Sequence, residues 1–222
     1  VRSGGNLAGT GGSINGAAFF AGSYTAPANQ ITTGPASYGT PFSAALDLAA
    51  ASAYFLAASN YAAALANTTL HTNTNGGQID VTTVSGLNVV TISAAELNSA
   101  YAFNVHGPGT LVINVTGTGT VSLDSTTWSY DNGAASTRTL LNYNQATGLN
   151  LSSGNVVNIL APNAAVNFSS GNLNGNLVAG SLAGSGQVNW VGTAQFSTIP
   201  APGAAGTLAL TALAATRRKR RR

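Results

Sequence analysis

The feature that most constrains the fold is a short internal repeat in the C-terminal half of the chain. The segment Asn150–Asn155, with the sequence Asn-Leu-Ser-Ser-Gly-Asn, recurs as Asn167–Asn172 with one substitution, and each copy is followed by a short apolar run. A third, degenerate copy spans Gly180–Trp190. Such repeats, with strands separated by Asn and Gly turns, are typical of the stacked coils of a β-solenoid. Chance similarity in an Asn-, Ser- and Gly-rich chain and a sandwich of antiparallel strands are the alternatives.

The rest of the region from Gln78 to about Trp190 is a succession of short strands separated by Gly, Asn and Ser. No helical pattern interrupts it, which excludes the alternating strands and helices of a βαβ fold. Two of the strands break the apolar-polar alternation, at Val89-Val90 and at Val156-Val157. The expected strands are rich in Val, Ile, Leu and Thr, and they are Leu87–Ile92, Ala102–Val105, Leu111–Val115, Val121–Leu123, Thr139–Asn142 and Val156–Leu160.

One long helix is predicted over residues 43–66, a stretch with neither Gly nor Pro. Ser43 is placed to cap its start, Asp47 lies in its first turns, and Asn67 follows its end. At about 1.5 Å per residue the helix would be roughly 35 Å long. A membrane span is the competing interpretation, but the polar residues and the many alanines favour a helix that packs closely on a neighbour. Its small side chains recur at three- and four-residue spacing, at Leu46, Ala50, Ala53, Ala57, Tyr61 and Ala64.

The distribution of charge excludes several classes of function. Only 6% of the 222 residues are charged, and six of the eight basic residues are the last six of the chain. The remaining residues carry two arginines against five acids, a net charge of −3. A nucleic-acid-binding surface of distributed Lys and Arg is therefore not expected. With no Cys and two His residues, the chain is also poorly supplied for metal or thiol chemistry, and we predict neither a cofactor nor a metal.

The C-terminal segment, residues 199–222, forms a separate unit. A Pro-rich break at Ile199–Gly203 is followed by an apolar segment, residues 204–216, and by the basic end Arg217–Arg222. As a helix the apolar segment would span only about 20 Å of the ~30 Å hydrocarbon core, so it is a marginal, transient membrane anchor. An Arg-rich end behind a short apolar segment is typical of a chain held with its cationic end in the cytoplasm. A basic tail that binds nucleic acid or serves as a nuclear address is the alternative.

This order of segments resembles the PEP-CTERM sorting signals of Gram-negative bacteria. The matching motif is Pro200, Ala201, Pro202 and Gly203, and it lacks the acidic residue of the commoner Pro-Glu-Pro form. The basic stop would be Arg217, Arg218, Lys219, Arg220, Arg221 and Arg222. The resemblance implies export, followed by removal of the tail by an exosortase, which would be a partner of this chain.

Residues 1–198 resemble the choice-of-anchor A family of surface proteins. The matching stretches are Ser3–Asn6, the Ala-rich helix, Leu111–Gly117, Arg138–Tyr143, Val157–Ala164, Gly175–Leu182 and Gly186–Trp190. The resemblance implies a mainly β, right-handed, ice-binding-like β-solenoid with the long helix packed alongside, and a short apolar helix would follow in the tail. It also implies an adhesive role, and by comparison with the family the N-terminal part is expected to be truncated.

An enzyme that acts on polysaccharide is an alternative because some β-solenoids are lyases or glycosidases. Glycoside hydrolysis needs two carboxylates about 5–9.5 Å apart. Asp124 and Asp131 flank a segment that contains Trp128 and Tyr130, so these four residues are a candidate glycan site, although capping of a solvated loop is the simpler interpretation. His71 and His106 are interpreted as solvated loop residues. No Gly-x-Ser-x-Gly motif occurs, and no catalytic residue is predicted.

Ice binding is the second alternative, and it would need a flat face of regularly spaced threonines. Thr116–Thr120 and Thr82-Thr83 supply threonines, but none recurs at the offset of the repeat. We therefore predict an exported, non-enzymatic protein of the cell surface or extracellular matrix of a Gram-negative bacterium. Its partners would be extracellular polysaccharide or other surface proteins, and not nucleic acid. It would present an almost uncharged surface of Asn, Ser, Thr and Gly.

Overall fold

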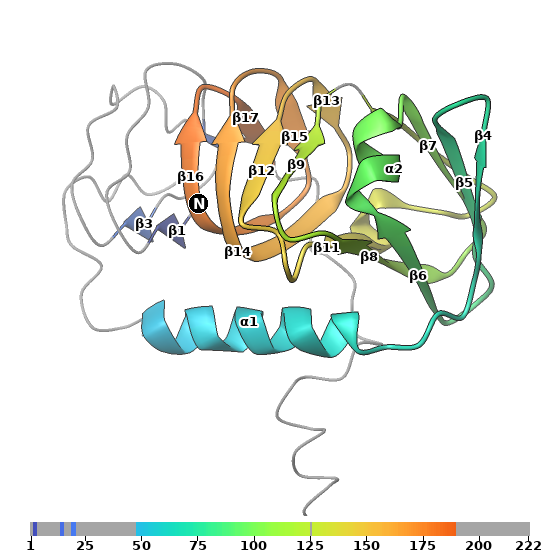
Figure 1. Ribbon diagram of the computed structural model, residues 1–222, viewed down its shortest axis with the longest axis horizontal. Helices are drawn as coiled ribbons and strands as arrows, with labels where there is room; N and C mark the ends of the chain where they lie inside the picture. Colours follow the sequence, from blue (N-terminus) through green and yellow to red (C-terminus); the bar gives the residue numbers. More distant parts are fainter. Residues whose placement is uncertain (1, 4–13, 16–18, 21–47, 125, 190–222) are drawn as a thin grey trace, which may run out of the picture.

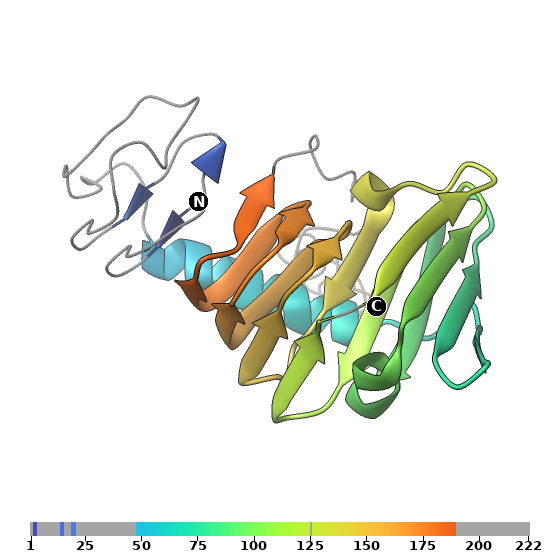
Figure 2. The ribbon, with the colours of Figure 1, turned by 90° about the horizontal axis from the view of Figure 1, so that it is seen from above.

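The structure is a computed structural model that describes residues 2–3, 14–15, 19–20, 48–124 and 126–189. Here the chain winds into stacked coils with strands on three faces (Figures 1 and 2). Strands of neighbouring coils pair in parallel, and a single hairpin supplies the one antiparallel pairing in the described chain. The expectation of a mainly β, solenoid-like fold is confirmed, and an antiparallel sandwich is excluded.

The three faces are each crossed once per coil, in the same order. The helix-covered face contains β6 (Leu87–Ser93), β8 (Thr110–Thr116), β11 (Thr139–Asn142) and the first halves of β14 (Asn158–Phe168) and β16 (Leu177–Gly184). The open face contains β9 (Thr120–Leu123), β12 (Gly148–Leu151) and the second halves of β14 and β16. The third face contains β4 (His71–Thr74), β5 (Gln78–Thr82), β7 (Ala102–His106) and β10 (Thr127–Asp131), then β13 (Gly154–Asn155), β15 (Asn172–Asn174), β17 (Gln187–Asn189) and β2 (Ile14–Asn15). A short 3-10 turn, η2 (Ser136–Arg138), precedes β11, and β1 (Arg2–Ser3) pairs with β3 (Phe19–Phe20).

The core lies between the three faces and consists of columns of apolar side chains that stack from coil to coil. The helix-covered face contributes Val90, Ile113, Leu141, Ile159 and Leu177. The open face contributes Val121, Leu149, Val166 and Leu182. The third face contributes Ile79, Phe103 and Trp128. Because parallel pairing places like positions above one another, each column continues from one coil to the next.

The repeat in the sequence corresponds to one coil. Asn150 lies directly beside Asn167, so the offset of the sequence repeat is the register of these two strands. Between β13 and β15 the offset is one residue longer, because Gly154 lies beside Asn172. Earlier coils are longer still, and Ile113 is followed in its column by Leu141. Variable corners thus hide the repeat in the first half of the sequence.

Helix α1 (Leu48–Ala63) lies along the outside of the helix-covered face (Figure 1). Ala62 packs against Val89 and Val112, and the side chains of Asn114 and Asn142 reach the helix from the strands. Because the core lies on one side of β6 and α1 on the other, Val89 and Val90 are both buried. This explains the apolar pair that breaks alternation in the sequence.

The helix ends at Ala63, before the predicted Ala66. The side-chain amide of Asn114 donates to the carbonyl of Ala62 at 2.8 Å, and Leu65 closes a tight turn onto the same carbonyl. The chain then turns along β6, where the backbone N–H groups of Thr68 and Thr69 donate to Val89. The predicted helix start, with Ser43 and Asp47, lies outside the described residues.

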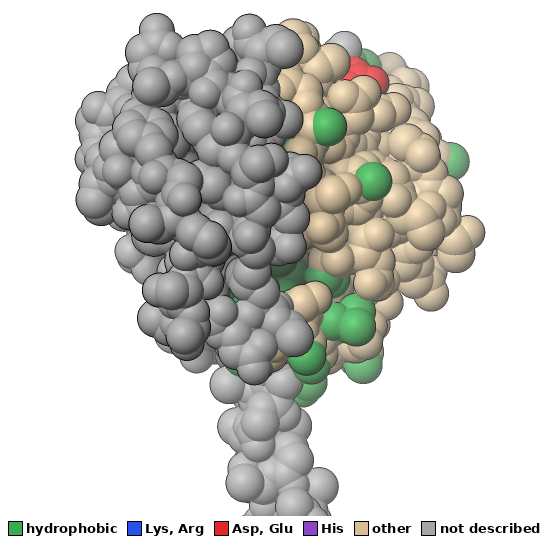
Figure 3. Space-filling model, turned by 90° about the vertical axis from the view of Figure 1, so that its left-hand side faces the viewer, with side chains coloured by type: hydrophobic (Ala, Val, Ile, Leu, Met, Phe, Trp, Pro, Cys, Tyr) green, Lys and Arg blue, Asp and Glu red, His purple; other side chains and the backbone are tan. Residues whose placement is uncertain are grey.

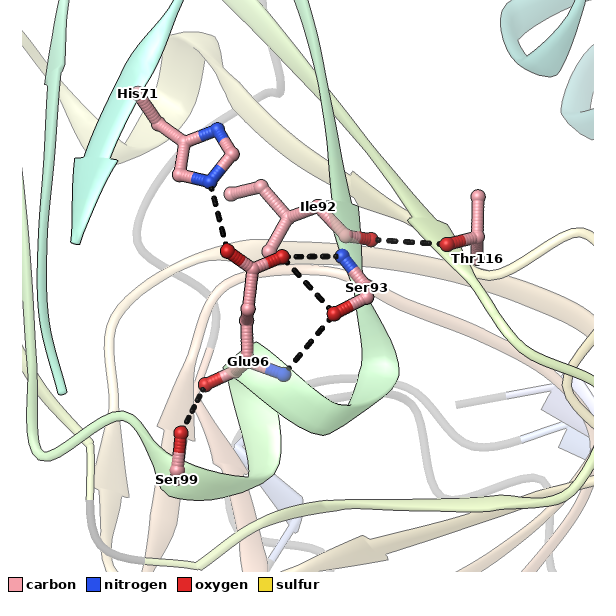
Figure 4. A network of polar contacts seen from close by, with 6 residues as sticks. All are labelled: His71, Ile92, Ser93, Glu96, Ser99 and Thr116. Carbon is pink, nitrogen blue, oxygen red and sulfur yellow. Dashed lines mark hydrogen bonds and ion pairs between the residues drawn. The ribbon is translucent and has the colours of Figure 1, made fainter. Parts of the chain in front are cut away.

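A second helix, α2 (Ala94–Ser99), corrects the expectation that no helix interrupts the strands. Ser93 accepts a hydrogen bond from the backbone N–H of Glu96, and the Glu96 carboxylate accepts one from the backbone N–H of Ser93, which is a capping box (Figure 4). In the first coil α2 takes the place of an open-face strand, and the Asn98 side chain accepts a hydrogen bond from Ser122 of β9 at 2.7 Å. Together with the β4–β5 hairpin, α2 closes this end of the solenoid.

One predicted strand begins later than expected. The strand predicted at Val156–Leu160 starts at Asn158 and runs through a bend to Phe168, because Val156 and Val157 form the corner after β13. The degenerate third copy forms β16 and β17 and stacks on the second, as predicted. The whole sorting tail, including Pro200–Gly203 and Arg217–Arg222, lies outside the described residues. Within the described part, no helix is long and apolar enough to cross a membrane.

Candidate binding face

The open face is the part of the described molecule that most resembles a ligand-binding surface. On β9 and β12 residues alternate strictly, with the apolar side chains in the core and the others directed outward. The outward positions form two rows that run across the coils. One row is Thr120, Gly148, Ala165 and Ser181, and the other is Ser122, Asn150, Asn167 and Ala183.

This face carries no charge at its eight outward positions. Neighbouring parallel strands lie about 4.8 Å apart, so each row repeats at that spacing. The described surface that is visible in Figure 3, which views the left-hand end of Figure 1, is also uncharged apart from one acidic patch. Asn167 is exposed, whereas Asn150 is half-buried and donates to the Ser122 hydroxyl at 3.5 Å. The face therefore offers hydroxyl and amide groups to a neutral, hydrogen-bonding ligand.

Several neighbouring polar groups are already used within the fold. At the corner after the open face, Ser152 donates to the carbonyl of Asp124 at 2.9 Å, and Ser185 donates to the carbonyl of Ser169 at 2.7 Å. These hydroxyl groups join neighbouring coils. The groups available to meet a ligand are thus those of the two rows.

The four residues of the candidate glycan site do not come together at one surface. Asp124 lies just after β9, exposed, and its carboxylate accepts a hydrogen bond from Ser152 at 3.2 Å. Trp128 is buried, stacks on Phe103 with 4.7 Å between ring centroids, and donates to the side-chain oxygen of Asn155 at 3.2 Å.

The other two residues of that candidate site lie further along β10. Tyr130 stacks on Trp128 and its hydroxyl donates to the carbonyl of Val156, while Asp131 is exposed at the end of the strand. The reason is the two-residue period of β10, which directs Trp128 and Tyr130 into the core and Asp131 outward. The aromatic rings therefore contribute to the core and leave no stacking platform for a sugar beside the acids.

The two histidines correct a second expectation, since both lie in strands and both contact carboxylates. His71 begins β4, and its Nε2 lies 3.1 Å from a carboxylate oxygen of Glu96 (Figure 4). His106 ends β7 and contacts Asp131 and Asp80. These contacts join residues that are a full coil apart in the chain, so only the coil register reveals them.

Two of the described acids, Asp80 and Glu96, have lowered pKa values. The side-chain amides of Asn104 and Gln78 donate to Asp80 and lower its pKa. The capping-box hydrogen bond from Ser93 lowers the pKa of Glu96, and His71 lowers it further. A general acid needs the opposite, a carboxyl group with a raised pKa. In the described residues no group of His, Asp or Glu side chains is arranged to hold a metal ion.

Comparison with known families decides the relationship of the chain. The model of the family described as "Putative Ice-binding-like adhesive domain" matches residues 1–190. The chain belongs to this family. A search of curated proteins gave no match.

Three ice-binding proteins are among the solved structures that resemble this chain. One comes from an Antarctic Flavobacteriaceae bacterium, with a TM-score of 0.53 and 16% identity over 85% of this chain and 45% of that one. The chain thus spans less than half the length of that protein. The ice-binding protein of the Antarctic ascomycete Antarctomyces psychrotrophicus gives a TM-score of 0.45 and 21% identity over 88% and 93% of the two chains. An ice-binding protein from an Antarctic biological consortium gives a TM-score of 0.46 and 14% identity over 84% of this chain and 83% of that one. At these identities the likeness concerns the fold.

Proposed function

We propose that this chain is an exported, non-enzymatic protein of the choice-of-anchor A type, and that it adheres through its open face. The observation that carries the proposal is the pair of outward rows of small, uncharged hydroxyl, amide and methyl groups on four parallel strands. Such a face suits extracellular polysaccharide or the surface of a neighbouring protein, because it binds without the cost of desolvating charges. Membership of an adhesive-domain family supports it.

Binding of the purified full-length chain to a glycan array and to intact bacterial cells tests this proposal. Asn167→Asp places a charge in the middle of the open face and is expected to reduce binding at least tenfold. Gln187→Glu is the matched control, because it makes the same amide-to-carboxylate change on β17 of the third face. Equal loss in both variants, or no binding by the unsubstituted chain to any glycan or cell, would contradict the proposal.

Ice binding is the second candidate function, and the fold shared with an ice-binding protein favours it. The regular spacing of the two rows is compatible with an ordered water layer. However, the outward positions include one threonine, Thr120, among eight residues. Thermal hysteresis of the full-length chain decides between the candidates, since an adhesin that binds glycans need not lower the freezing point.

We also propose that the coils wind in the right-handed sense and that residues 199–222 are a PEP-CTERM-type sorting tail. Right-handed crossovers between parallel strands are strongly preferred in proteins, which supports the handedness. For the tail, the motif Pro200–Gly203, the apolar sequence of residues 204–216 and the basic end Arg217–Arg222 support transient membrane insertion as a short helix, then cleavage by an exosortase in a Gram-negative bacterium. Intact-mass measurement of surface-extracted protein should show loss of the basic end, and its retention would contradict sorting.

A further inference from the structure

Charge is distributed very unevenly along the solenoid. Residues 139–189, which form β11 to β17, contain no Asp, Glu, Lys, Arg or His. The described carboxylates and both histidines belong to the earlier coils and to the closed end, where α2 and β4 lie. Any response of the described fold to pH near neutrality must therefore arise in the first three coils.

His106 stands at the centre of this charged region. It ends β7, which lies on the third face between β5 on one side and β10 on the other. Its Nδ1 lies 2.6 Å from Asp131 Oδ1 on β10, and its Nε2 lies 3.5 Å from Asp80 Oδ1 on β5. One side chain thus contacts carboxylates of the coil before and the coil after its own.

The protonation state of His106 decides whether both contacts are attractive. An imidazolium ion has two N–H donors, whereas a neutral imidazole has one donor and one acceptor. Because carboxylate oxygens face both ring nitrogens, the neutral ring must turn a lone pair toward one of them. The two contacts are satisfied together only by the protonated ring.

The other groups around His106 are neutral donors that serve the carboxylates. Asn104 and Gln78 donate to Asp80 at 2.8 and 3.0 Å. Asn132 donates to Asp131 at 3.0 Å. The one described basic residue nearby, Arg138, donates to the carbonyl of Gly133 and is not paired with either acid by a described contact.

We propose that His106 is a pH-dependent bridge that stabilises the contacts between the first three coils at mildly acidic pH and stabilises them less when the ring becomes neutral. The remaining coils, which have no side chain that titrates near neutral pH, keep their stability. The solenoid would then loosen from its closed end at alkaline pH while the half formed by residues 139–189 stays intact.

The direction of the pKa shifts agrees with this proposal. The hydrogen bond to Asp131, helped by Asp80, raises the pKa of His106 above its ordinary 6.5. Stability from a raised histidine pKa is fully present below about pH 6.5 and is lost as the pH rises through the folded-state value. The lowered pKa of Asp80 acts in the opposite sense, because its contribution is present above about pH 3.8 and is lost as the pH falls through the lowered value. The bridge is therefore strongest between these limits.

Amide hydrogen exchange of the full-length chain at about pH 5.5 and about pH 8, corrected for intrinsic exchange rates, tests the bridge. We expect protection of β5, β7 and β10 to fall several-fold at the higher pH, and protection of β14 and β16 to stay unchanged. His106→Gln, which can donate one hydrogen bond but cannot titrate, should remove this pH dependence. His71→Gln is the matched control, because it alters the other histidine–carboxylate pair at the same end and should leave the pH response of β7 and β10 in place.

An equal pH response in the unsubstituted chain and in His106→Gln would overturn the proposal, as would a uniform loss of protection over all coils. Titration of the His106 ring by NMR in the unsubstituted chain gives a second measurement that needs no variant. A midpoint above 6.5 is expected, and a midpoint at or below it would also overturn the bridge.

Discussion

At the scale of single residues, buried asparagines connect the helix to the coils. Asn142 is fully buried, accepts a hydrogen bond from the Ser59 hydroxyl at 2.6 Å, and donates to the Ser59 carbonyl and to Asn114. Asn114 in turn donates to the carbonyl of Ala62. Every polar atom of these two side-chain amides has a hydrogen-bond partner, so the helix docks on polar contacts as well as on the apolar contact of Ala62.

Asn142→Leu keeps the side-chain size but removes the hydrogen bonds that Asn142 makes with the hydroxyl and the carbonyl of Ser59. Unsatisfied buried polar groups cost about 1–3 kcal/mol each, so we expect the free energy of unfolding to fall by roughly 3 kcal/mol in urea denaturation. Ser59→Ala in the same background should then cost less than it does alone, because the contact is already lost. Asn73→Ala, at an exposed position of β4, is the control and should change stability by less than about 0.5 kcal/mol.

Glycines at coil corners allow a second measurement at this scale. Gly107 has φ of +93°, and a Cβ there would lie 2.1 Å from the carbonyl oxygen of Thr83 on the neighbouring coil. Gly86 has φ of +98° with open space around it, and Gly119 has neither constraint. We expect thermal unfolding to show that Gly107→Ala lowers the free energy of unfolding by several kcal/mol, on the order of 3. Gly86→Ala should lower it by about 1 kcal/mol, and Gly119→Ala should leave it almost unchanged. Equal losses at Gly86 and Gly107 would mean that the close approach of Gly107 to the Thr83 carbonyl does not add to the cost of the substitution.

At the scale of elements, much of the fold could be predicted from the sequence. The strands were found because their composition and flanking turn residues are local properties, and Thr139–Asn142 agrees to the residue. Helix α2 was missed because so short a segment cannot show helical periodicity, although the Ser93-x-x-Glu96 capping box was present as a signal. The residues of the candidate glycan site were assigned to a loop for a related reason. The alternation of Trp128, Ser129 and Tyr130 indicates a strand with inward aromatics, but the polar neighbours suggested a loop.

Strand register gives a prediction at the element scale, since Asn150 of β12 and Asn167 of β14 are direct neighbours. Asn150→Asp together with Asn167→Asp places two like charges side by side. In urea denaturation, we expect the double variant to lose roughly 0.5–1 kcal/mol more free energy of unfolding than the two single variants lose together. Asn150→Asp with Asn167→Lys should reverse the sign of this coupling, and about 1 M salt should suppress both effects. A coupling that is the same for both pairs would contradict the register.

At the scale of the whole molecule, the contacts that hold the solenoid together could not be predicted, because they depend on coil lengths that differ. The sequence shows one regular repeat, yet within one core column the step from Ile113 to Leu141 is much longer than the step from Leu141 to Ile159. The docking of α1 and the pairing of β2 with β17 join residues far apart in the chain. Such contacts leave no periodic signal in one sequence.

Solenoid stability is approximately a sum over coils and their interfaces, which predicts that one coil can be removed. Ile159 and Leu177 occupy successive positions of one core column. Deletion of residues 158–175 would bring Leu177 to the place of Ile159 beside Leu141, and Asn176 to the place of Asn158, to which it is hydrogen-bonded in the intact chain. We expect this variant to keep a β-rich circular dichroism spectrum and cooperative unfolding at a lower melting temperature.

The matched control removes half as much of the chain, residues 158–166, from the same place. That deletion brings Ser169 and Ser170 to the places of the buried Leu160 and Ala161 and removes most of one open-face strand. Because a solenoid accepts only whole coils, we expect it to abolish cooperative unfolding. If both deletions unfold the protein, the coils are not separable units, and α1, which spans several of them, fixes the solenoid as a single cooperative body. If both remain folded, the stacking of like positions contributes little to stability, and the columns of the core are a consequence of the winding and not its cause.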